Sequence, residues 1–384
     1  MSPHPTAPPA LGTAAPAPLV VVCAGGGGVG KTTTAAALAL ALARRGKSTL
    51  IVTIDPARRL AGALGVPIAD TVTRVALPAA GGRLFALMPD PRRSLRTFVE
   101  YLFEDDPEAL ARVLAGGIYR GFADAAAGVH ELVAMNLVAH AASRDRFDAV
   151  VIDTAPSRHA IEFVTYPGRL AALLGGRAVT WLAALVRRAD GPADPDGDTS
   201  PAVLSGGTGF VARLIGRVTG PWLVRETALL FADLARVRER FVALTARAAE
   251  LLLGERSAYA LVAAPTAAAH DDVLYLVKRL AKLGRKPRSI VINRADTAPA
   301  PYAQTLRASP ALPGAIAEVL ATLEEERARR TEAADRLAAD LAAHLPGVPQ
   351  VRLSYLELPA PEAIVMALAD ELDPHLGDLL PAPV

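Results

Sequence analysis

The chain is 384 residues long, is 52% hydrophobic, and carries a formal net charge of +2. A charge this close to neutral argues against a surface dedicated to nucleic acid or to a membrane, so we expect no nucleic-acid partner. The single cysteine, Cys23, excludes an internal disulfide and a soft thiolate metal site, and is typical of a protein of the reducing cytoplasm.

The first 18 residues are rich in proline and alanine and lack the basic-then-apolar pattern of a signal peptide. We therefore expect a disordered tail over residues 1–18. The nearest approach to a membrane-spanning run, Leu170–Val186, is interrupted by Arg177. We expect residues 19–372 to form one domain and residues 373–384 to form a second tail.

A phosphate-binding loop is predicted at Leu19–Thr34, whose sequence is LVVVCAGGGGVGKTTT. An apolar strand, Leu19–Cys23, leads into the pattern G-x-x-x-x-G-K-[ST] and then into a helix. Glycines let backbone N–H groups converge on phosphate oxygens at the positive end of that helix. Lys31 is predicted to contact the β- and γ-phosphates, and the Thr32 hydroxyl to ligate Mg²⁺. The predicted nucleotide-binding residues of the loop are Gly25, Gly26, Gly27, Gly28, Val29, Gly30, Lys31, Thr32 and Thr33.

The remaining predicted elements alternate between strands and helices. Strands are predicted at 49–54, 84–88, 147–152, 258–263, 289–292 and 351–354, and helices at 33–43, 271–283, 315–345 and 362–372. Two helical stretches, about 94–145 and 161–253, are predicted as insertions that form a helical subdomain. This alternation predicts an α/β fold with a doubly wound, mostly parallel sheet of the P-loop NTPase type, with ligands at the carboxyl ends of the strands.

Two carboxylates follow predicted strands at that edge of the sheet. Asp55 is a candidate to orient the water that attacks the γ-phosphate, and the alternative is a turn aspartate before Pro56. Asp153 closes the apolar run VVI, as in the second nucleotide motif, and is predicted to hold Mg²⁺ directly or through water.

Four segments, in this order, resemble the ArsA-type ATPases, which include the arsenite-pump ATPase and the eukaryotic ATPase that targets tail-anchored membrane proteins. They are GGVGKTT at 27–33, IDPARRL at 54–60, DTAPSRH at 153–159 and VINR at 291–294. The resemblance covers roughly residues 19–372 and implies a deviant phosphate-binding loop, ATP and Mg²⁺ as cofactors, a nucleotide-dependent homodimer and two switch loops. It makes Asp55 the catalytic carboxylate of the first switch and residues 153–159 the second switch. The resemblance also implies that Asn293 recognises adenine, because a side-chain amide can pair with both a donor and an acceptor on the base.

The chain departs from the family pattern in its loop and in its cysteines. The family's loop usually reads GKGGVGKT, and Gly26 stands where that extra lysine would be. The zinc-binding Cys-x-x-Cys of the eukaryotic dimer is absent, as are the arsenite-binding cysteines. We therefore expect a dimer that does not depend on zinc, and no arsenite site. Arg158, where the family has glycine, is the candidate to supply charge to the γ-phosphate, in cis or across the dimer; the alternative is a pairing with Glu162.

The predicted function is a Mg²⁺-dependent ATP hydrolase whose nucleotide cycle opens and closes the helical subdomain, to handle a hydrophobic client or a membrane partner. The alternative is a low-turnover nucleotide-binding switch, in which the missing lysine has removed hydrolysis. Phe210, Leu214, Val218 and Trp222 recur at helical spacing, and they either pack the core of the subdomain or line a client groove.

Overall fold

The structure of the chain is a computed structural model. It describes residues 17–54, 59–68, 70–76, 81–117, 119–120, 138, 147–155, 229–230, 232–234, 236–266, 268–295 and 314–381.

One sheet organises this part of the chain. Its strands are β1 (Leu19–Gly25), β2 (Ser48–Thr53), β3 (Thr73–Val75), β4 (Arg83–Leu87), β5 (Ala149–Asp153), β6 (Ser257–Ala263), β7 (Ser289–Ile292) and β8 (Gln350–Arg352). They lie in the order β3-β4-β2-β5-β1-β6-β7-β8, and every neighbouring pair is parallel except β3 and β4. The predicted α/β fold with a mostly parallel sheet of the P-loop NTPase type is therefore confirmed.

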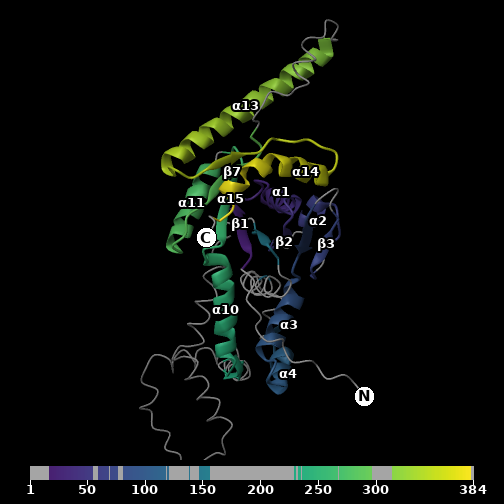
Figure 1. The fold of residues 1–384 in the computed structure, drawn as a ribbon, viewed down its shortest axis with the longest axis vertical. Helices are drawn as coiled ribbons and strands as arrows, with labels where there is room; N and C mark the ends of the chain where they lie inside the picture. Colours follow the sequence, from purple (N-terminus) through teal and green to yellow (C-terminus); the bar gives the residue numbers. More distant parts are fainter. Residues whose placement is uncertain are drawn as a thin grey trace, which may run out of the picture.

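Helices cover both faces of the sheet (Figure 1). They are α1 (Lys31–Arg44), α2 (Arg59–Leu64), α3 (Pro91–Leu102), α4 (Pro107–Ala115), α10 (Arg238–Leu253), α11 (Ala269–Lys282), α13 (Gly314–His344), α14 (Pro361–Leu372) and α15 (Leu376–Leu379), with a 3₁₀ turn η3 (Asp373–His375). Successive side chains of a strand point to opposite faces of the sheet. Val21 and Cys23 of β1 thus pack with α1, α2, α14 and α15, whereas Val20 and Val22 pack with α10, α11 and α13.

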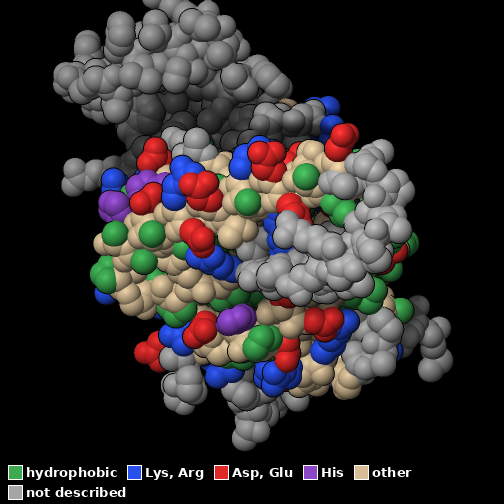
Figure 2. All heavy atoms as spheres, turned by 90° about the horizontal axis from the view of Figure 1, so that it is seen from above, with side chains coloured by type: hydrophobic (Ala, Val, Ile, Leu, Met, Phe, Trp, Pro, Cys, Tyr) green, Lys and Arg blue, Asp and Glu red, His purple; other side chains and the backbone are tan. Residues whose placement is uncertain are grey.

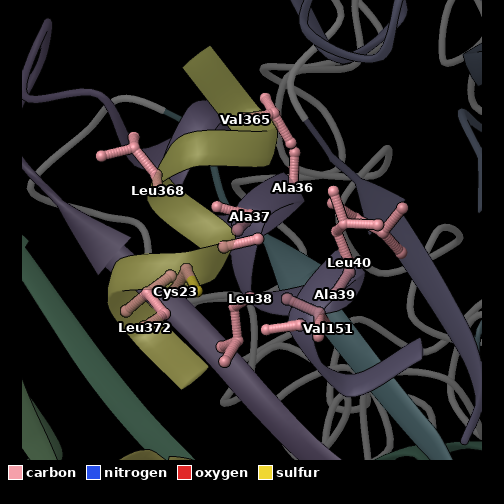
Figure 3. Close-up of a cluster of buried hydrophobic side chains, with 14 of the residues drawn as sticks. Cys23, Ala36, Ala37, Leu38, Ala39, Leu40, Val151, Val365, Leu368 and Leu372 are labelled. Atoms are coloured by element: carbon pink, nitrogen blue, oxygen red, sulfur yellow. The ribbon is translucent and has the colours of Figure 1, made fainter. Parts of the chain in front are cut away.

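The helix that follows the predicted loop is buried along most of its length. Alanine fills α1, and small side chains let neighbouring backbones approach closely. Figure 3 shows Ala36 and Ala37 of α1 beside Val365 and Leu368 of α14. The N-terminus of α1 is held in place by this packing on the sheet and on α14.

A third apolar core lies outside the sheet. It is formed by α3, α4 and the first half of α10, and contains Leu102, Phe103 and Phe241. The second half of α10 packs on the sheet through Ala248 and Leu252. One continuous helix therefore joins the sheet to the helical region.

Two aspartates fix where the helices of that region begin. The carboxylate of Asp90 accepts a hydrogen bond from the backbone N–H of Arg93 at 2.9 Å, and that of Asp106 accepts from Ala109 at 2.9 Å. A proline follows each aspartate at the first helical position, where a missing N–H costs nothing. The described residues between 91 and 120 thus include two capped helices, and the extent of the predicted helical insertion stays a prediction.

The prediction of a tail at 373–384 is wrong for residues 373–381. These residues form η3 and α15, and the side chain of Leu379 is buried. The Arg288 guanidinium also donates to the Leu380 carbonyl at 2.9 Å. Asp373–Pro374 has the sequence of a helix terminator, but the chain turns once and buries two more leucines against the sheet. The short elements β3 and α2 were not predicted.

None of the helices in the described ranges is both long enough and apolar enough to cross a membrane.

Candidate functional site: a phosphate-binding loop and its carboxylate

The predicted loop joins β1 to α1 at the carboxyl edge of the sheet, next to the ends of β5, β6 and β7. Gly27 and Gly28 are exposed, whereas Gly25 and Gly26 are buried. Gly28 has φ 73° and Gly30 has φ 89°, which are left-handed conformations that side chains disfavour. The glycines therefore provide a backbone that opens to solvent at the helix N-terminus, which is the geometry that binds phosphate.

Two of the glycines also make room for neighbouring groups. A Cβ atom at Gly25 would lie 2.1 Å from the carbonyl oxygen of Val262, and one at Gly30 would lie 2.1 Å from the amide nitrogen of Asn293. No side chain fits at either position without moving β6 or Asn293. The loop thus packs directly against the ends of the neighbouring strands.

Lys31 is the buried cation of the loop. Its side chain curls back so that the ammonium donates a hydrogen bond to the Gly26 carbonyl at 2.6 Å. The residue is 5% exposed, and its charge is close enough to lower the pKa of Cys23. Burial, and after it the Asp153 carboxylate, outweigh Lys31 and raise the pKa of that thiol far above its usual range, so Cys23 stays protonated. The Lys31 ammonium therefore lies against the loop, at the place where phosphate oxygens would bind.

The Asp153 side chain joins the end of β5 to the end of β2 and to the first turn of α1. Its carboxylate oxygen Oδ2 accepts a hydrogen bond from the Thr32 hydroxyl at 2.8 Å and another from the Thr53 hydroxyl at 2.8 Å. The side chain is fully buried at the end of β5. Thr154, the next residue, donates its hydroxyl to the Cys23 carbonyl at 2.9 Å and so ties the end of β5 to β1.

The donors around Asp153 fit a magnesium ion. The Thr32 hydroxyl and the Asp153 carboxylate are hard oxygen ligands, and they already lie within 2.8 Å of each other. Magnesium binds proteins through one or two such groups and keeps water and phosphate oxygens for the rest of its shell. Thr32 and Asp153 are therefore the two residues that would hold the ion, and their role as ligands stays a prediction.

Asn293 lies against the loop and follows β7. Its backbone N–H donates to the Ala263 carbonyl at 2.8 Å, and its side-chain amide donates to the Val29 carbonyl at 2.9 Å. One amide hydrogen bond is therefore committed to holding the loop. The reading of adenine by Asn293 stays a prediction, and the structure adds a second role in positioning Val29 and Gly30.

An acidic side chain lies beside the glycine at the family's lysine position. A Cβ atom at Gly26 would lie 2.5 Å from carboxylate oxygen Oδ2 of Asp272, in the first turn of α11. Asp272 was not singled out from the sequence, because an acid in the first turn of a helix is common. The structure shows that this acid borders the phosphate-binding loop.

The structure thus brings Lys31, Thr32, Asp153 and Asn293 together with the glycines of the loop. Asp55 and Arg158 lie outside the described residues, as does the 210–222 stretch of the second helical insertion. Thr53 was missed, because a threonine that ends a strand is an ordinary β residue. Its position two residues before Asp55 is the signal that could have found it.

The sheet topology, the glycine loop after β1 and the carboxylate at the end of β5 define the class of this chain as a P-loop NTPase fold. Residues 19–191 match the family of anion-transporting ATPases (ArsA). The resemblance to the ArsA-type ATPases is therefore confirmed over this part of the chain.

Three curated fungal proteins are similar to the chain over a shorter stretch. ATPase get3 of Schizosaccharomyces japonicus is 31% identical over 121 residues, which cover 32% of this chain and 35% of that protein. ATPase get3 of Schizosaccharomyces pombe is 29% identical over 128 residues, which cover 33% and 37%. ATPase GET3 of Rhodotorula glutinis is 32% identical over 129 residues, which cover 34% and 35%. The matched stretch thus spans about a third of the length of these relatives.

Proposed function

We propose that the chain is a Mg²⁺-dependent ATPase, formed by a single domain with helical insertions that acts in the cytoplasm as a homodimer. The observation that carries the proposal is the contact between Thr32 and Asp153, beside the buried Lys31. Thr32 and Asp153 supply two oxygen ligands and Lys31 supplies a cation, all at the carboxyl ends of the paired strands β1 and β5. The ArsA match and the similarity to proteins named ATPases support the same reaction.

The chemistry assigned to each residue follows from its place. The loop N–H groups and Lys31 would bind the phosphates, and Thr32 and Asp153 would hold Mg²⁺, which neutralises charge that develops on the transferring phosphoryl group. Asp55, which follows the end of β2 by two residues, is proposed to orient the attacking water. Arg158 is proposed to contact the γ-phosphate in place of the lysine that the family has at position 26.

Coupling to the helical region is proposed to run through α10. This helix buries Phe241 in the helical core and Leu252 in the sheet core, and the Tyr259 hydroxyl of β6 donates to the Leu252 carbonyl at 2.9 Å. A shift of β6 on nucleotide binding would therefore be passed to the helical core by one rigid element. The helical region is proposed to use this movement to handle a hydrophobic client or a membrane partner, as the family resemblance implies.

The test is a matched pair of lysine substitutions in the full chain. Lys31→Ala is expected to weaken binding of Mg-ATP, or to slow phosphate release, by at least about tenfold, because it removes the cation at the β- and γ-phosphates. Lys47→Ala removes a lysine at the start of β2, on the opposite edge of the sheet, and is expected to leave both unchanged. Equal ATP binding and turnover in the two variants would overturn the proposal.

A low-turnover nucleotide switch is the second candidate. It is favoured by the Asp272 carboxylate beside Gly26, since the loop then carries negative charge where the family has a lysine. Steady-state phosphate release separates the two functions. ATP binding with turnover at the level of a Lys31→Ala control would favour the switch.

A further inference from the structure

The first half of α13 extends away from the rest of the described structure (Figure 1). The second half packs on the sheet through Ala334, Leu337 and Leu341, all of which are buried. Among the described side chains between 316 and 330, none is buried. The first half of this helix therefore does not pack into a hydrophobic core of the described structure.

The exposed half continues the apolar face of the buried half. At about 100° per residue, positions 316, 319 and 323 fall on the same face as Ala334 and Leu341. Ile316 is 45% exposed, Val319 is 59% exposed and Leu323 is 46% exposed. We call these three residues the tip stripe. A solvated helix of a monomer would carry polar residues on this face.

A second apolar patch lies where α13 meets the sheet domain. The guanidinium of Arg330 stacks on the Tyr355 ring, 4.6 Å from its centroid, so Tyr355 lies against the same face of the helix. Tyr355 is 36% exposed and Leu358 is 40% exposed. We call these two residues the shelf. The tip stripe and the shelf hold five of the six large hydrophobic residues that are exposed in the described part of the chain.

The charges on the same helix half are ordered along its length. Three glutamates at 324–326 precede arginines at 327, 329 and 330. In Figure 2, which looks down on this side of the molecule, acidic, basic and apolar side chains are interspersed. Within the helix, Glu325 pairs with Arg329 at 3.9 Å and Glu326 with Arg330 at 4.0 Å. Two such helices that run antiparallel also place the acidic end of one run beside the basic end of the other.

We infer that the first half of α13 is a docking surface for a second copy of this chain, with the tip stripe of each copy on the shelf of the other. A two-fold axis needs one surface that is complementary to itself, and two apolar patches about 16 Å apart along a helix, with charges of opposite sign between them, meet that need. The inference rests on the homodimer proposed above and names its surface.

The first test measures the oligomeric state of the full chain by analytical ultracentrifugation, without nucleotide, with ADP and with a non-hydrolysable ATP analogue. Val319→Glu with Leu323→Glu is expected to raise the dimer dissociation constant by at least about a hundredfold, because four charges enter an apolar contact. The control is Ala321→Glu with Ala328→Glu, which adds the same charge to exposed positions on the opposite face of the helix. It is expected to change the constant by less than about threefold.

The second test gives a positive signal. Val319→Cys and Tyr355→Cys are made in separate chains and mixed under mild oxidation with copper phenanthroline. The native Cys23 is buried and stays unreactive. Position 319 lies about 16 Å along α13 from Arg330, whose guanidinium stacks on Tyr355, so a disulfide between positions 319 and 355 is expected only from a contact between copies. A cross-linked dimer of the mixture, absent when Ala321→Cys replaces Val319→Cys, is the expected result.

Each alternative outcome is distinct. A wild-type chain that stays monomeric at about 100 µM in every nucleotide state would overturn both this surface and the proposed dimer. A dimer that tolerates both glutamates and does not cross-link would place the interface elsewhere and overturn the surface alone. In either case, ATP binding and turnover of the wild-type chain and of Lys31→Ala test the proposed ATPase reaction separately.

Discussion

Thr32 and Thr53 donate to the same oxygen of Asp153 at the same distance, 2.8 Å, which makes them a matched pair for testing the metal site. Thr32→Val and Thr53→Val each replace the hydroxyl by a methyl group and keep the branched shape. Each removes one hydrogen bond to a buried carboxylate, and such bonds are worth about 1.5–3 kcal/mol. We therefore expect both variants to lose a similar free energy of unfolding, measured in urea without nucleotide.

The two variants are expected to differ in magnesium dependence. Thr32 would contact both the magnesium ion and the Asp153 carboxylate, whereas Thr53 would contact only the carboxylate. Thr32→Val should slow phosphate release by at least about tenfold, which is 1.4 kcal/mol of transition-state stabilisation, and should raise the magnesium concentration needed for half-maximal rate. Thr53→Val should keep the parent magnesium dependence. A Thr53→Val variant that requires as much magnesium as Thr32→Val would refute the assignment of Thr32 as a ligand, since the two would then act only through Asp153.

Three further substitutions test the rest of the site. Asp55→Asn should bind ATP with the parent affinity but hydrolyse it at least about tenfold more slowly, and parent turnover would make Asp55 a turn residue. Arg158→Ala should lower turnover by at least roughly tenfold with little change in ATP affinity; normal hydrolysis would mean that the charge at the γ-phosphate comes from elsewhere. Gly30→Ala should lower the free energy of unfolding by about 2–3 kcal/mol, because it forces φ 89° on alanine and displaces the Asn293 amide. Gly27→Ala, whose Cβ would meet nothing within 4 Å, should change it by less than about 1 kcal/mol in the same urea titration.

The sheet was predictable because its strands are buried on both faces. Parallel strands of this kind are short, continuous apolar runs that end in glycine or aspartate, as β1 and β5 do, and helices separate them. The antiparallel edge strand β3 was not predictable in this way, since only Val75 of its three residues is buried. The C-terminal turn η3 was missed because the Asp–Pro pair that begins it is a stop signal in most contexts.

The site was predictable where a spacing encodes the chemistry. The glycines, Lys31 and Thr32 are fixed by one local pattern, and Asp153 by its place after a buried strand. Neighbours that come from distant parts of the chain leave no such pattern. Asp272 lies next to Gly26 only because β1 and β6 are paired, which brings the first turn of α11 to the loop.

The proximity of Gly26 and Asp272 bears on any attempt to rebuild the family's usual loop in this chain. A lysine introduced at position 26 would start with its Cβ within 2.5 Å of a carboxylate oxygen, so the aspartate would have to turn away. The new ammonium would then find its nearest anion inside its own chain, and an ion pair there would hold it back from a nucleotide on a neighbouring copy. Gly26→Lys should therefore gain little by itself. Adding Asp272→Ala would release the lysine, so the effect of Gly26→Lys is expected to depend on the residue at position 272.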